Sequence, residues 1–138
     1  IKDLPRGELN LCLLLVVIVL TDSLAYFGGR KFGKTPLAPG ISPKKTREGS
    51  LCGTVGSMFV GSVIAVNWLE FSWPMALLLT FLISVLGQVG DLVESKMKRL
   101  CGVKDSGKVL PGHGGVLDRL DSFLLTTPFF YYWMLLIA

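Results

Sequence analysis

Three carboxylates next to apolar segments are the residues of this chain best placed to do chemistry. Asp118 and Asp121 stand three positions apart, so they share one face if their segment is a helix. They lie near the start of the apolar segment 118–138, where they could simply cap a helix and interact favourably with its dipole. Asp91 stands at the end of another apolar segment. Because acids at a membrane boundary are costly unless they are occupied, we interpret all three as functional candidates.

Two clusters of basic residues accompany these acids. Lys or Arg occurs six times between Arg30 and Arg47 and five times between Lys96 and Lys108. Such clusters are typical of sites that bind several phosphates. They are also typical of loops that stay on the cytoplasmic side of a membrane, next to anionic lipid. The two interpretations are compatible with each other.

The polar stretch at 95–121 reads SKMKRLCGVKDSGKVLPGHGGVLDRLD and resembles the signature of the phosphatidate cytidylyltransferases, also called CDP-diacylglycerol synthases. That signature has Ser, two spacers, Lys-Arg, four spacers and Lys-Asp. Pro-x-His-Gly-Gly, two spacers and Asp-Arg-x-Asp follow. The positions of this chain in register with it are Ser95, Lys98, Arg99, Lys104, Asp105, Pro111, His113, Gly114, Gly115, Asp118, Arg119 and Asp121. Chance seldom matches so many fixed polar positions in so short a stretch.

The resemblance implies nucleotidyl transfer as the reaction. The phosphate of phosphatidic acid would attack the α-phosphorus of CTP, and pyrophosphate would leave. The resemblance also implies that Asp91 and Asp118 hold a divalent metal, with Asp121 as a further catalytic carboxylate. Mg²⁺ suits this role, because it takes oxygen ligands, usually one or two carboxylates, and completes its shell with phosphate and water. A phosphomonoester has a second pKa of about 6, so no strong general base is required. Catalysis then depends on alignment and charge neutralisation.

The remaining polar residues of the two basic regions are expected to bind phosphate and substrate. We assign Lys98, Arg99 and Lys104 to the catalytic centre as phosphate-binding cations. His113, the only His, stands between two glycines, where phosphate contact or loop ordering fits better than a general base. The expected substrate-binding residues are Lys34, Ser42, Lys44, Lys45, Ser95 and Arg119. Any of the phosphate-binding lysines or Arg99 could instead anchor a lipid headgroup. Ser95 could bind phosphate or metal, or only cap its loop.

Residues 28–35 read GGRKFGKT and match the P-loop pattern of Gly, four spacers, Gly-Lys-Thr. We reject a P-loop because these residues follow a membrane-length apolar segment and not a strand. Pro36 comes directly after Thr35, and a residue before Pro avoids helical geometry. The region instead resembles the upstream motif of the same family. The matching positions are Asp22, Phe27, Gly29, Gly33, Lys34, residues 41–46, Glu48 and Gly49.

Membrane helices must position these residues. The chain is 51% hydrophobic with a mean hydropathy of +0.58, which is typical of a polytopic membrane protein. Apolar segments at 9–27, 51–69, 74–93 and 118–138 are each near the roughly 20 residues that span a bilayer, and in lipid they must be helical. The second is rich in Gly, which suits close helix packing, and Pro74 suits a helix start. We predict an all-α transmembrane bundle of about four membrane helices with two polar cytoplasmic loops.

Loop charge predicts the orientation. The connections 28–50 and 94–117 are rich in Lys and Arg, whereas 67–73 has neither and contains Glu70. Because basic loops stay inside, both polar loops should face the cytoplasm, where nucleotides are. We expect a multi-pass protein of the bacterial inner membrane or, in a eukaryote, of the endoplasmic reticulum or another organelle. Residues 1–138 should be the C-terminal catalytic membrane domain of a longer chain.

The expected partners are CTP, phosphatidic acid and membrane lipids, with no nucleic acid and with a homodimer as one possible assembly. Cys12, Cys52 and Cys101 are dispersed and lack metal-ligand spacing, so they predict neither a zinc site nor a disulfide framework. The alternative enzymes are a CTP-dependent lipid kinase of the polyprenol type and a cytidylyltransferase for an ether lipid. A membrane transporter would use its acids as cation sites. The clustered basic loops and the full signature disfavour a transporter.

Overall fold

The computed structural model describes residues 6–100 and 114–137, and for residues 38, 42–44 and 114–122 it describes the backbone alone. The elements in these residues are α1 (Gly7–Phe32), β1 (Pro36–Ala38), β2 (Ser42–Thr46), α2 (Arg47–Leu69), α3 (Trp73–Leu100) and α4 (Gly114–Ile137). The first three helices are long and apolar enough to cross a membrane. In α4 the described apolar part, Phe123–Ile137, is shorter. The predicted all-α membrane bundle is confirmed, with a small hairpin added.

The helices extend beyond the apolar segments that predicted them. α1 continues to Phe32 and α3 to Leu100, and each has basic residues in its last turn. Cations there interact favourably with the helix dipole, which explains why these polar turns stay helical. α2 begins early, at Arg47, because Thr46 caps it: the Thr46 hydroxyl accepts the Gly49 N–H at 3.1 Å.

Glycines let α1 and α2 approach closely. A Cβ added to Gly49 would lie 2.5 Å from the carbonyl oxygen of Ala25, and one added to Gly53 would lie 2.6 Å from that of Thr21. Side chains at these positions would therefore force the helices apart. The close packing predicted from the Gly-rich segment is confirmed.

The apolar core lies in the half of the bundle that is remote from the hairpin. It consists of Leu13, Leu14, Val17, Ile18, Ala65, Leu69, Ala76, Leu79, Ile83, Phe130 and Met134. Buried hydroxyls join the helices around and beyond it: Ser84 Oγ accepts from Thr21 Oγ1 at 3.0 Å and from Ser57 Oγ at 3.2 Å. Ser62 and Thr80 pair at 3.1 Å. Such bonds hold helices together where lipid offers no hydrophobic driving force.

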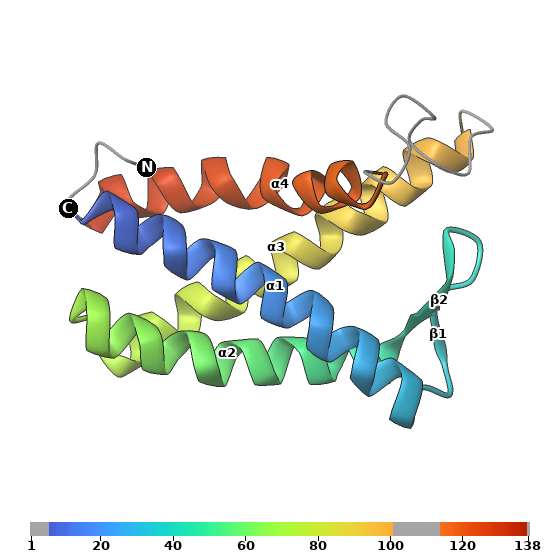
Figure 1. Ribbon diagram of the computed structural model, residues 1–138, viewed down its shortest axis with the longest axis horizontal. Coiled ribbons are helices and arrows are strands. Elements are labelled where there is room, and N and C mark those ends of the chain that lie inside the picture. The colour runs from blue at the N-terminus through green and yellow to red at the C-terminus, as the bar shows by residue number, and fades with distance from the viewer. Residues whose placement is uncertain (1–5, 101–113, 138) are drawn as a thin grey trace.

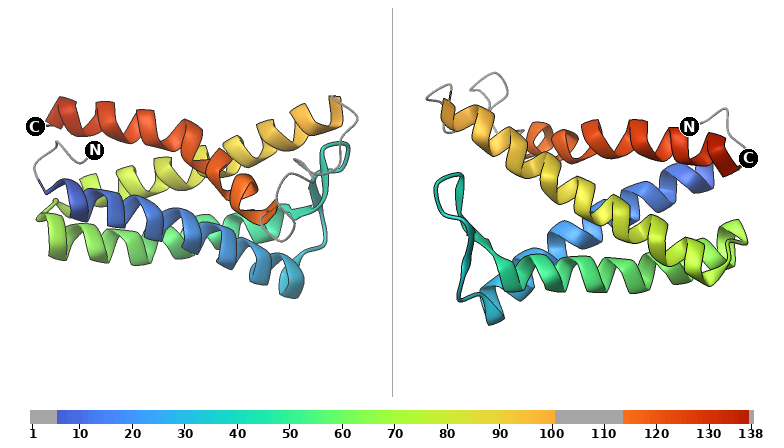
Figure 2. Two further views of the ribbon diagram at one scale, coloured as in Figure 1. Left: turned by 45° about the horizontal axis from the view of Figure 1, so that its top comes forward. Right: turned by 180° about the vertical axis from the view of Figure 1, so that it is seen from behind.

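The two ends of the bundle differ in charge. The hairpin, the end of α1, the start of α2 and the end of α3 lie at one end, which is shown on the right in Figure 1 and from two further directions in Figure 2. The link between α2 and α3 lies at the other end, where Arg6 Nη2 and Glu70 Oε1 form an ion pair of 3.0 Å. The basic last turns of α1 and α3 thus share one end with the hairpin, as two loops on the same side of a membrane require.

Candidate active site

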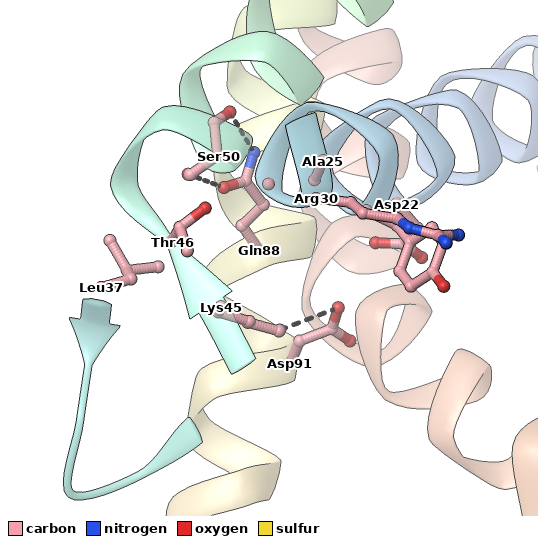
Figure 3. Close-up of a pocket in the computed structure, with 11 residues that line it drawn as sticks. Asp22, Ala25, Arg30, Leu37, Lys45, Thr46, Ser50, Gln88 and Asp91 are labelled. Atoms are coloured by element: carbon pink, nitrogen blue, oxygen red, sulfur yellow. Dashed lines mark hydrogen bonds and ion pairs between the residues drawn. The ribbon is translucent and has the colours of Figure 1, made fainter. Parts of the chain in front are cut away.

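A cavity of about 610 Å³ opens at the hairpin end, where α1, α2, α3 and the two strands meet (Figure 3). Its volume falls in the range of small-molecule sites. The polar side chains in its described lining include Asp22, Arg30, Lys45, Ser50, Gln88 and Asp91. Acidic and basic side chains therefore line the same cavity, at the end of the bundle that lies away from the apolar core.

Asp91 and Lys45 meet in this cavity. Lys45 Nζ lies 3.4 Å from Asp91 Oδ2, with 36% and 19% of the two side chains exposed (Figure 3). Asp91 comes from α3, and Lys45 comes from β2, just before the start of α2. Both are predicted site residues, and the structure brings them together. An ammonium beside a half-buried carboxylate can bind a phosphate, and the carboxylate can hold a cation.

The hairpin that carries Lys45 is fixed at its base and at its turn. At the base, the Arg47 N–H donates to the Thr35 carbonyl at 3.0 Å. The strands pair antiparallel, with Pro36 opposite Thr46 and Ala38 opposite Ser42. At the turn, Arg99 Nε donates to the Ile41 carbonyl at 3.4 Å. Lys45 is thus presented from a braced strand instead of a loose loop.

The structure supports the rejection of a P-loop. Residues 28–32 form the last turn of α1, so the segment ends a helix instead of preceding one. The N–H groups of Lys34 and Thr35 both donate to Glu48 Oε2, at 3.3 and 3.2 Å. The backbone donors that a phosphate would need are therefore used inside the protein.

The other predicted residues with described side chains lie outside the cavity lining. Lys98 forms an ion pair with Glu94 one turn away on α3. Arg99 braces the hairpin, as described above, and Lys34 is exposed. Ser95 is half-buried on α3, one turn beyond Asp91. Their expected roles stay predictions.

The remaining predicted residues cannot be placed by their side chains. Lys104 and His113 lie outside the described residues, and Ser42, Lys44, Asp118, Arg119 and Asp121 have only their backbone described, in β2 and in the first turns of α4. Phe123 of α4 lines a second hollow of about 280 Å³ together with Asp22 and Tyr26, which also line the main cavity. The first turns of α4 therefore lie at the same end of the bundle as Asp91.

Several polar residues of the cavity wall were missed as site residues, and for Asp22 and Gln88 the sequence held a signal. Asp22 appeared only as part of the upstream resemblance, although a lone acid in an apolar segment was a readable signal. Gln88 lies inside the third apolar segment, and an amide there signals a hydrogen-bonded contact between helices. In the structure, Gln88 Nε2 donates to Thr54 Oγ1 at 2.8 Å, and Ser50 Oγ donates to Gln88 Oε1.

The oxygen donors of the cavity fit Mg²⁺. Asp22 and Asp91 supply carboxylates to its wall, and hard oxygen ligands select Mg²⁺ over metals that prefer nitrogen or sulfur. Within the described residues no group of three His, Cys, Asp or Glu gathers. Mg²⁺ does not need such a group, because one or two carboxylates with phosphate and water suffice.

Comparison with known proteins agrees with this chemistry. The model of the cytidylyltransferase family matches residues 1–137. The phosphatidate cytidylyltransferase of Helicobacter pylori is 52% identical over 118 residues, which are 86% of this chain and 44% of that protein. That of Bacillus subtilis is 50% identical over 124 residues, 89% of this chain and 46% of the relative. That of Synechocystis is 46% identical over 140 residues, 99% of this chain and 46% of the relative. The chain spans less than half the length of these relatives. Over nearly all of its own length, it belongs to the cytidylyltransferase family.

Proposed function

We propose that this chain forms the catalytic part of a phosphatidate cytidylyltransferase, which makes CDP-diacylglycerol and pyrophosphate from CTP and phosphatidic acid. The observation that carries the proposal is the meeting of Asp91 and Lys45 in a cavity at the polar end of a membrane bundle. The family match covers both residues. The named relatives are themselves phosphatidate cytidylyltransferases.

The reaction needs charge neutralisation and alignment. A phosphate oxygen of phosphatidic acid attacks the α-phosphorus of CTP, the bond to the bridging oxygen of the β-phosphate breaks, and that oxygen leaves with pyrophosphate. Lys45 and Arg30 are the described cations of the cavity and would bind phosphate oxygens. Asp91, together with Asp118, would hold Mg²⁺, which supplies a further positive charge where negative charge develops. The attacking phosphate is largely ionised at neutral pH, so the chain need not supply a strong base.

The second hollow supports a lipid as one substrate. It lies beside the main cavity and shares Asp22 and Tyr26 with it, and the rest of its lining includes Val19, Phe27 and Phe123. Val19 is 49% exposed and Phe27 is 63% exposed. Exposed apolar side chains on a membrane helix face lipid tails, so a lipid headgroup could reach the charged cavity while its chains remain in apolar surroundings.

The expected side of the membrane follows from the charged ends of the bundle. Basic turns of α1 and α3 flank the cavity, and basic segments stay on the cytoplasmic side. CTP would enter from that compartment, and the lipid from the bilayer. A homodimer stays a prediction.

Labelled CTP tests the proposal on the full-length protein in liposomes that contain phosphatidic acid. Label in the α-phosphate should appear in the lipid product, and label in the γ-phosphate should appear in pyrophosphate. A lipid kinase would instead transfer the γ-label to lipid, and a transporter would show solute flux without CTP turnover. Either result would overturn the proposal. Asp91→Asn is the control that should lower the rate of α-label transfer by about 10²–10³.

A further inference from the structure

Gln88 joins α3 to α2 at the wall of the cavity (Figure 3). Its Nε2 donates to Thr54 Oγ1 at 2.8 Å and to the Ser50 carbonyl at 3.4 Å, and its Oε1 accepts from Ser50 Oγ. The Thr54 hydroxyl in turn donates to the Ser50 carbonyl at 3.0 Å. Both amide hydrogens and the amide oxygen of Gln88 therefore have partners. The Ser50 and Thr54 hydroxyls each donate one hydrogen bond, so no donor faces another donor.

The position of this contact matters more than its strength. Gln88 stands three residues before Asp91, so it lies one turn away on the same face of α3. Ser50 lies in the first turn of α2, which follows directly from the strand that carries Lys45. The carboxamide therefore connects the two elements that supply Lys45 and Asp91, next to the pair itself.

We propose that Gln88 is a positioning residue: its carboxamide fixes the start of α2 against α3 and thereby holds Lys45 at its distance from Asp91. The inference rests on the proposed function, because it concerns the alignment of phosphate and metal in that site. The carboxamide uses two donors and one acceptor to bind Ser50 and Thr54 together. Glu at this position would lose both donors and add a negative charge one turn from Asp91. A misplacement of about 1 Å can cost about a hundredfold in rate.

The test compares Gln88→Leu with Thr80→Val in the full-length protein. Thr80→Val removes the 3.1 Å bond to Ser62, which also joins α2 to α3 but lies in the remote half of the bundle. Both variants should lower the melting temperature by a similar few degrees. Only Gln88→Leu should lower kcat/KM for CTP, by about tenfold or more. It should also raise the concentration of MgCl₂ that gives half of the maximal increase in melting temperature, a readout that requires no turnover.

A double-mutant cycle with Lys45→Met shows whether Gln88 acts through Lys45. If it does, Gln88→Leu should cost much less in kcat/KM when Lys45 is already absent. Equal losses in both backgrounds, or a Gln88→Leu variant that behaves like Thr80→Val, would overturn the inference while the wild type still makes CDP-lipid. A wild type without CDP-lipid synthesis would instead overturn the proposed function.

Gln88→Asn keeps the carboxamide on a shorter side chain and serves as the second variant if Gln88→Leu does not fold. It should show the same kinetic loss with a smaller change in melting temperature, and wild-type kinetics would contradict the inference.

Discussion

Replacing Asp91 by Asn should separate the activity of this protein from its stability. The change keeps the size of the side chain and removes the charge that faces Lys45 at 3.4 Å. We expect turnover to fall by about 10²–10³, because one electrostatic contact to a reacting phosphoryl group is worth about 3–4 kcal/mol. Asp118→Asn should act alike. Because both acids would serve one metal centre, the double variant should be little worse than either single variant.

The effect on folding should be much smaller. At an effective dielectric constant of about 20, two charges 3.4 Å apart attract by roughly 5 kcal/mol. Lys45 is 36% exposed, so solvent screening and the desolvation of both groups remove most of this energy. Pairs near the surface contribute about 0–1 kcal/mol net. The melting temperature of Asp91→Asn should therefore change by only a few degrees, or even rise if the nearby acids repel each other without a cation.

The assay measures CDP-lipid formation at rising Mg²⁺ together with the melting temperature in detergent. Glu70→Gln is the matched control, because it removes one carboxylate from an ion pair with Arg6 at the opposite end of the bundle. This control should keep wild-type turnover. Near-normal turnover of Asp91→Asn would refute the metal-site assignment. So would a loss of turnover that simply follows a loss of folding.

Three further predictions follow from the fold. Cysteines introduced at Lys31 and Glu70, in a chain without native cysteines, should react with a membrane-impermeant thiol reagent from opposite sides of sealed vesicles. Labelling of both cysteines from the same side would contradict the topology. Thr35→Ala should keep the Mg²⁺ dependence of activity, since Thr35 contacts Glu48 through both its N–H and its hydroxyl and does not line the cavity; an altered metal requirement would favour a P-loop after all. Gly49→Ala should lower the melting temperature by the equivalent of about 1–3 kcal/mol, because its Cβ would lie 2.5 Å from the Ala25 carbonyl. Gly40→Ala, whose Cβ would meet nothing within 4 Å, should be neutral, and equal melting of the two variants would count against the close helix contact.

The membrane helices could be predicted from the sequence because lipid leaves the backbone no alternative to helical hydrogen bonds. Their ends could not, because polar last turns stay helical for reasons that hydropathy does not measure. Arg30 and Lys31 extend α1 beyond its apolar segment. The hairpin was missed for a related reason: 36–46 shows no strand alternation, and its bracing comes from distant partners such as Arg99.

The site was predictable in its residue types and only partly in its geometry. Asp91 was singled out as an acid at the end of an apolar segment and Lys45 from the family resemblance, but nothing local in the sequence predicts that they meet. Their contact depends on the hairpin returning to α3 and on the early start of α2 at Arg47. Gln88 carried a local signal, an amide in an apolar segment, without any indication of its partners on α2.

The division of the bundle into two halves explains why the site can carry charge. The apolar core lies between the starts of α1 and α3 and the ends of α2 and α4, where Leu13, Leu79 and Phe130 are fully buried. This half stabilises the helix arrangement mainly by burial of apolar side chains and contains none of the charged residues of the cavity. In the hairpin half, glycine contacts join α1 to α2, and hydroxyls and the Gln88 carboxamide connect α3 to these helices without filling the cavity. Carboxylates and cations can therefore face an open volume there. Replacing one of them should lower turnover strongly while changing the free energy of unfolding only slightly.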